Sequence, residues 1–150
     1  MVSNPHIIFV YPPGCNTSVE NARSWFGMCL GSAYIISYLN QKGIAACQFV
    51  NSEPLTINRC AAAIPELHPR MVGFTIDNSN YFLGQLIARK LKEAAPHIPV
   101  IFGGLLPTLH APTILETNPF VDICVRNEGE ETCLECKRYC LWFCFFLIPY

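Results

Sequence analysis

The chain has 150 residues, which is enough for one domain with a hydrophobic core and short for two. Because 51% of the residues are apolar and only 14% are charged, the composition excludes an intrinsically disordered chain. Ten basic side chains against eleven acidic ones give a formal charge of −1 with no basic stripe, so we expect no nucleic-acid partner.

The two ends of the chain favour a cytoplasmic protein without a membrane partner. The first six residues contain no lysine or arginine, and the apolar stretch 7–11 is too short for a signal peptide. The apolar run from Tyr139 to the C-terminus falls short of the roughly 20 residues that span a bilayer as a helix. The nine cysteines are odd in number and irregularly spaced, and we expect most of them to be reduced thiols.

Short apolar runs alternate with helical stretches from the start of the chain. Residues 7–11 form a continuous apolar run, which is typical of a parallel strand covered on both faces. Apolar side chains at helical spacing predict a helix over 28–42, and Gly43 stands where a C-terminal cap belongs. The second strand is predicted over 44–50.

The alternation continues to the end of the chain. A helix weakened by Pro65 is predicted over 55–67, followed by a strand over 71–76. Residues 77–80 offer several N-caps for a helix that runs to about residue 95. The remaining predicted elements are a strand over 98–102, a loop containing Pro107 and Pro112, a short helix ending near Asn118, a strand over 120–126 and a last helix opening at 128–131.

This order of elements predicts an α/β fold built from βαβ units. With five strands and right-handed crossovers, the most common arrangement is a flavodoxin-like (Rossmann-like) three-layer sandwich whose parallel sheet has the order 2-1-3-4-5. In such folds ligands bind outside the carboxyl ends of the strands. The candidate binding loops are therefore 12–27, 77–80, 103–111 and 126–130.

Two of these loops have a composition suited to a ligand. Paired glycines at Gly103 and Gly104 let a large planar ligand lie against bare backbone, although a tight turn without a ligand explains them equally well. In the last loop, Gly129 stands among carboxylates at the start of a predicted helix, where acidic residues also serve as dipole partners.

Six segments follow one another in order between residue 7 and about residue 134. They are Tyr11-Pro12-Pro13-Gly14, the stretch Leu30 to Leu39 with Lys42-Gly43, Val72-Gly73-Phe74-Thr75, Ile98 to Gly104, Asn118 to Asp122, and Val125 to Thr132. In this order and spacing they resemble the cobalamin (vitamin B12)-binding domain of radical S-adenosylmethionine proteins, which precedes a catalytic barrel.

The resemblance implies a cobalamin whose corrin ring lies across the carboxyl ends of the strands, with the nucleotide tail between sheet and helix. By position, the implied cofactor-binding residues are Pro13, Gly14, Thr75, Asn78, Gly103, Gly104, Pro107, Thr108, Glu128 and Gly129. No catalytic or metal-ligating residue is expected. The iron-sulfur cluster and S-adenosylmethionine would belong to a barrel that this chain lacks and that another chain could supply, so the module should not turn over alone.

The sequence departs from the family pattern at two positions in these loops. The family commonly has Gly-Gly-x-His-Pro-Thr after the fourth strand, whereas Leu106 stands in the place of the histidine here. It also commonly has Arg-Gly-Glu-Gly-Glu after the fifth strand, where this chain has Asn127.

The first loop differs from that of the better-known cobalamin proteins. They supply an axial histidine from an Asp-x-His-x-x-Gly motif, but this chain has no histidine between His6 and His68. We therefore expect a cobalamin without an axial histidine from the first loop.

The last residues are unlike the closing helix of such a domain. Cys133, Cys136, Cys140 and Cys144 have the spacing C-x2-C-x3-C-x3-C, which could suit a metal but differs from the radical S-adenosylmethionine signature C-x3-C-x2-C. We favour a domain over 1–134 and a cysteine- and aromatic-rich tail over 135–150 that is truncated or aberrant.

Two alternatives to a cobalamin-binding module stay open. The first is a non-functional truncated remnant whose loops have decayed. The second is a flavodoxin-like or receiver-like signalling domain. Receivers need an acidic cluster after the first strand and a lysine after the fifth, but Pro12 and Pro13 follow the first strand and no lysine follows the fifth before Lys137. Thr17 and Ser18, which could bind a flavin phosphate, are set apart from the strand end.

Overall fold

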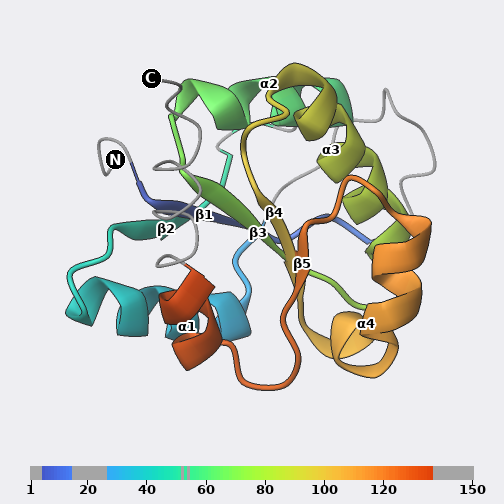
Figure 1. The fold of residues 1–150 in the computed structure, drawn as a ribbon. Coiled ribbons are helices and arrows are strands. Elements are labelled where there is room, and N and C mark those ends of the chain that lie inside the picture. Colours follow the sequence, from blue (N-terminus) through green and yellow to red (C-terminus); the bar gives the residue numbers. More distant parts are fainter. Residues whose placement is uncertain (1–4, 15–26, 52, 54, 137–150) are drawn as a thin grey trace, which may run out of the picture.

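The computed structural model describes residues 5–14, 27–51, 53 and 55–136. Its centre is one parallel sheet with the order β2-β1-β3-β4-β5, which confirms the predicted flavodoxin-like topology (Figure 1). The strands are β1 (Ile7–Val10), β2 (Ala46–Gln48), β3 (Met71–Thr75), β4 (Val100–Gly103) and β5 (Ile123–Cys124).

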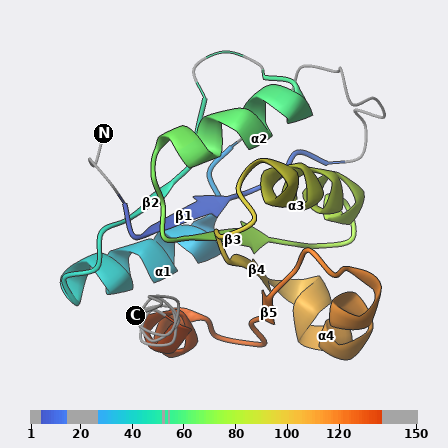
Figure 2. The ribbon, with the colours of Figure 1, turned by 45° about the horizontal axis from the view of Figure 1, so that its top comes forward.

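Helices cover both faces of the sheet and complete the three layers. They are α1 (Leu30–Gln41), α2 (Ile57–Glu66), α3 (Tyr81–Ala94), α4 (Leu105–Thr117) and a last helical segment over 130–136. Figure 2 shows α2 and α3 over one face, with α1 and the 130–136 segment over the other. Among the described residues, every helix is too short or too polar to cross a membrane.

The core consists of two apolar clusters, one on each face of the sheet, because successive side chains of a strand point to opposite faces. Ile8, Phe74 and Phe102 belong to the cluster beneath α2 and α3, where the two phenylalanine rings lie 5.5 Å apart. Ile7 and Phe9 belong to the cluster beneath α1. All four residues of β1 are buried, which explains why its sequence is apolar without alternation.

The helix ends follow the local sequence closely. Gly43 adopts a left-handed φ of 75° directly after α1, as its predicted capping position requires. The Thr56 hydroxyl accepts a hydrogen bond from the Arg59 N–H and caps α2. Pro65 lies in the last turn of α2, which ends one residue later.

The prediction of a loop after the fourth strand is wrong, because α4 begins immediately after Gly104. Pro107 occupies the first turn, where a missing N–H costs nothing because those groups have no partner within the helix. Pro112 is accommodated by a kink at His110, whose φ of −130° and ψ of 25° are not helical. Of the binding loop predicted over 103–111, only Gly104 lies between β4, which ends at Gly103, and α4.

Candidate functional site

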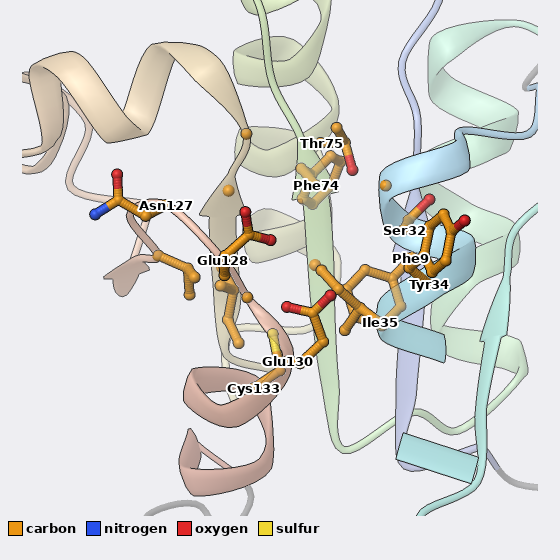
Figure 3. Close-up of a pocket in the computed structure, with 17 residues that line it drawn as sticks. Phe9, Ser32, Tyr34, Ile35, Phe74, Thr75, Asn127, Glu128, Glu130 and Cys133 are labelled. Atoms are coloured by element: carbon orange, nitrogen blue, oxygen red, sulfur yellow. The ribbon is translucent and has the colours of Figure 1, made fainter. Parts of the chain in front are cut away.

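A cavity of about 360 Å³ lies between the sheet and α1 and reaches the carboxyl ends of the strands (Figure 3). The sheet side of its lining comes from β1, β3 and β4. The opposite side comes from the first turns of α1 and from the chain that follows β5. This is the edge where ligands bind in open α/β sheets.

The cavity exists because glycine replaces a side chain in the middle of β3. Gly73 pairs with Phe9 on one side and with Ile101 on the other, and all three line the cavity. A Cβ atom at Gly73 would lie 3.0 Å from the Phe9 ring. The face of the sheet beneath α1 is therefore left hollow at this point.

Gly103 and Gly104 both line the cavity, but they differ in what a side chain would meet. A Cβ at Gly103 would make an ordinary contact of 3.8 Å with the Cβ of Val125. A Cβ at Gly104 would lie 2.8 Å from the carbonyl oxygen of Ile76, and the φ of Gly104 is 101°. The fold itself thus requires glycine at 104, whereas Gly103 offers bare backbone to a ligand.

The loop after β3 is held by Asn80, which is fully buried. Its side-chain oxygen accepts from the Asp77 N–H at 2.9 Å, and its amide nitrogen donates to the Thr75 carbonyl at 3.0 Å. Residues 77–80 were expected to cap the next helix, but Asn80 makes no side-chain capping bond and braces the loop instead. Asn78 is exposed and does not line the cavity.

The ends of β1 and β3 meet at the switch point of the sheet. The Tyr11 hydroxyl donates to Asp77 at 3.4 Å, and the position of a Cβ at Gly14 is 3.7 Å from the Ser79 hydroxyl. Partial burial would raise the pKa of Asp77, but hydrogen bonds from Ser79, Asn80 and Tyr11 outweigh it and lower that pKa below its usual value. An ionised carboxylate therefore stands at this edge. Pro13 and Gly14 lie beside it and outside the cavity.

Thr108 joins the two last loops of this edge. Its hydroxyl donates to the Gly104 carbonyl at 2.8 Å and accepts from the Asn127 N–H at 2.9 Å. The Thr108 carbonyl accepts from the Arg126 side chain at 3.2 Å. Neither Thr108 nor the buried Pro107 lines the cavity. Thr108 acts on the site indirectly, because its hydroxyl ties Gly104 to Asn127.

The segment after β5 closes the cavity on the side of α1. Gly129 is buried, and a Cβ there would lie 2.8 Å from Ile35. Figure 3 shows the Glu130 side chain reaching toward Ile35, with Glu128 between Glu130 and Asn127. Both carboxylates line the opening, which gives an apolar cavity an acidic rim.

Asn127 occupies the position at which the resembling family commonly has glycine, and its φ is 58°. Asparagine tolerates this left-handed region better than most residues, so the departure keeps the backbone shape. We expect Asn127→Gly to change the free energy of unfolding by less than about 0.5 kcal/mol and Asn127→Val to cost about 1–2 kcal/mol. Urea denaturation measures both, and equal effects would show that the left-handed backbone is not what this position requires.

Cys133 and Cys136 lie on the last helical segment and are buried in the cluster beneath α1. Burial, with Cys136 and Glu130 nearby, raises the pKa of Cys133 to about 12 and keeps its thiol protonated. Within the part of the chain that is described, no three histidine, cysteine or acidic side chains gather to hold a metal. Cys140 and Cys144 lie outside the described residues.

Half of the residues predicted for the site line the cavity, namely Thr75, Gly103, Gly104, Glu128 and Gly129. Pro13, Gly14, Asn78, Pro107 and Thr108 do not. Phe9, Gly73, Ser32, Ile35 and Cys133 line it without having been predicted. The sequence contained one sign of the cavity, because Gly73 interrupts a strand of otherwise bulky residues. A glycine inside a strand often marks a place where a ligand or another backbone comes close.

A family model described as "B12 binding domain" matches residues 27–137. The chain is 28% identical over 130 residues to the anaerobic magnesium-protoporphyrin IX monomethyl ester cyclase of Rubrivivax gelatinosus, covering 85% of this chain and 23% of that protein. The cyclase of the same name from Cereibacter sphaeroides is 27% identical over 83% of this chain and 20% of its own length.

An uncharacterized methyltransferase of Pyrococcus horikoshii is 27% identical over 84% of this chain and 27% of its own length. The chain thus spans about a quarter or less of each of these relatives.

Proposed function

The chain belongs to the B12-binding domain family, and on that premise we propose that it binds a corrinoid at the carboxyl edge of its sheet. It would act as the cofactor module of a radical S-adenosylmethionine-type, methyltransferase-like protein in the cytoplasm. The catalytic barrel, with its iron-sulfur cluster and S-adenosylmethionine, would come from further sequence or from another chain. A bound corrinoid supplies a cobalt centre that can carry a methyl group.

The cavity beneath α1 is the observation that carries this proposal. A corrin ring with its amide side chains is much bulkier than about 360 Å³, so only the nucleotide tail of a corrinoid can enter. The floor at Gly73 has no side chain, and the lining is mainly apolar, which suits a flat heterocyclic base.

The ring would lie outside the cavity, against the strand ends. Leu30 and Tyr34 at the start of α1 and Leu105 and Leu109 at the start of α4 are between 62% and 73% exposed. These side chains stand on the two helices that begin at the carboxyl ends of the strands, where they would offer apolar contacts to the ring. Gly103 and Gly104 would let the ring approach the backbone, and Pro13, Gly14 and Asn78 would flank its edge.

The rim of the cavity can accept hydrogen bonds. Glu128 and Glu130 line the opening, and their carboxylates can accept from the amide side chains of a corrin ring. The first strand leads to Tyr11 and Pro12, so we also expect no axial histidine from the first loop.

Corrinoid binding is tested by incubating the purified chain with hydroxocobalamin under reducing, anaerobic conditions and recording the visible spectrum after gel filtration. We expect corrinoid bands to elute with the wild-type protein. Gly103→Trp should abolish them, because Gly103 lines the cavity and a Cβ there meets only an ordinary contact with Val125. Ala62→Trp places the same side chain at an exposed position on α2, across the sheet, and should leave binding unchanged.

A colourless wild-type protein would favour the remnant hypothesis. Retention of the bands by Gly103→Trp, with folding verified by circular dichroism, would show that the cavity is not the site.

A further inference from the structure

The first turns of α1 form one wall of the cavity, and the corrinoid site proposed above requires this wall to stay at a fixed distance from the sheet. Gln48 is the last residue of β2, the outer strand next to β1, and it does not line the cavity. On the premise of the proposed function, we propose that Gln48 is a positioning residue. It holds the start of α1 against the sheet and so sets the affinity for the nucleotide tail of a corrinoid.

The start of α1 has few anchors of its own. Cys29 stands at the N-cap position but makes no side-chain capping bond, and the first turn contains no acidic residue. Within α1, the buried residues are Ser32 and Leu39. The buried residue at the cavity end is therefore a serine, which offers little apolar contact and needs hydrogen-bond partners instead.

Gln48 ties down both the first turn of α1 and the chain that leads into it. Its side-chain oxygen lies 3.1 Å from the Ser32 hydroxyl, and its amide nitrogen donates to the Gly27 carbonyl at 3.0 Å. Because the Gly27 carbonyl can only accept, it fixes the orientation of the Gln48 amide. The Ser32 hydroxyl also lies 3.0 Å from the Cys29 carbonyl, so its proton stands between two acceptors.

The backbone of Gln48 is fixed to the strand that forms the floor of the cavity. Gln48 pairs with Phe9 in the register of β1 and β2, and the next N–H, that of Phe49, donates to the Phe9 carbonyl at 2.7 Å. Phe9 lines the cavity on the sheet side and Ser32 lines it on the side of α1 (Figure 3). Gln48 thus connects floor and wall. A gap of about 1 Å between them would forfeit up to roughly half of the attraction of each van der Waals contact that a ligand makes.

A second amide links the same helix to the same strand away from the cavity. Asn40 accepts from the Ala46 N–H and donates to the Ala46 carbonyl, both at 3.0 Å. It lies in the last turn of α1, about 12 Å from Ser32 along the helix axis. Neither Asn40 nor Ala46 lines the cavity. Asn40 is therefore the matched control, since it joins α1 to β2 without holding the cavity wall.

The experiment compares Gln48→Met with Asn40→Leu, because each replacement keeps the size of the side chain and removes its hydrogen bonds. Each purified variant is titrated spectroscopically with hydroxocobalamin and with cobinamide, which lacks the nucleotide tail. We expect Gln48→Met to lower the ratio of the two affinities at least fivefold, because the cavity encloses the tail and not the ring. Asn40→Leu should leave this ratio within twofold of the wild-type value, although both variants should unfold at lower urea concentrations. The ratio of two affinities is independent of any loss of folded protein.

Ser32→Ala tests the route by which Gln48 acts. It removes the hydroxyl that Gln48 contacts and should itself lower the ratio. In the double variant with Gln48→Met, the reduction should be smaller than the product of the two single reductions, because both replacements remove the same contact. A reduction equal to that product would show that Gln48 does not act through Ser32, and it would overturn the proposed role.

An unchanged ratio in Gln48→Met, or an equal reduction in Gln48→Met and Asn40→Leu, would also overturn the positioning role of Gln48. Equal affinities of the wild-type chain for hydroxocobalamin and cobinamide would do the same, since the tail would then gain nothing from the cavity, while the corrinoid site itself would stand. If neither corrinoid bound to the wild-type chain, the proposed function would fail and the role of Gln48 with it.

Discussion

Replacing Gly104 with alanine is expected to destabilise the domain by about 3 kcal/mol, through backbone strain and a clash together. The φ of 101° is rarely adopted by a residue with a side chain, and the new Cβ would meet the Ile76 carbonyl oxygen at 2.8 Å. Neither group can move aside, since the Ile76 N–H donates to the Gly103 carbonyl at 2.7 Å and the Leu106 N–H donates to the Ile76 carbonyl at 3.3 Å.

Two other glycines separate the contribution of backbone strain from that of the clash. Gly43 has a left-handed φ of 75°, and no atom lies near the position of a Cβ there. Gly43→Ala should therefore lower the free energy of unfolding by about 1 kcal/mol through backbone strain alone. Gly103→Ala has neither strain nor a close contact and should change stability by less than about 0.5 kcal/mol. Urea denaturation of the three variants measures these differences. If Gly104→Ala proved no worse than Gly43→Ala, the close approach of the two strand ends would not be a real constraint.

The second large effect is expected at Asn80. Its replacement by alanine removes hydrogen bonds to the Asp77 N–H and to the Thr75 carbonyl at a position that is fully buried. The loss should lower the free energy of unfolding by about 2–3 kcal/mol, because two polar backbone groups lose their partner. Asn78→Ala, two residues earlier and exposed, should change it by less than about 0.5 kcal/mol.

Thermal and urea unfolding of the two variants give the comparison. Equal stabilities would mean that the loop after β3 is held by its own turn geometry rather than by Asn80. The result also bears on the site, since this loop contacts the end of β1 through Tyr11 and Asp77.

The architecture of this domain was predictable from its sequence for a local reason. Five apolar runs separated by helical stretches are compatible with only a few topologies. The observed strand order is the commonest of these. Gly43 and Pro65 marked helix ends through their own backbone preferences, which act without help from distant residues. The start of α4 was predicted wrongly, because Pro107 and Pro112 are typical of a loop. The kink at His110 that accommodates Pro112 is a feature of the structure and has no signal in the sequence.

The candidate site was predictable only in part, because a cavity depends on neighbours that are distant in sequence. Gly103, Glu128 and Gly129 could be placed at the carboxyl edge, since strand ends of a parallel sheet meet there. The ten predicted residues came from matching motifs, and that matching could not distinguish side chains that face a ligand from side chains such as Thr108 that tie loops together.

By itself, the sequence determined the class of fold, the edge of the sheet at which a ligand is expected and the resemblance to B12-binding domains. These follow from hydrophobic periodicity, from the order of elements along the chain and from short motifs, all of which can be read from neighbouring residues. Only the tertiary structure decided that Gly73 opposite Phe9 leaves a hollow beneath α1, and that Gly104 must be glycine because Ile76 lies against it. Both depend on the register between strands, which brings together backbone atoms from segments far apart in the chain.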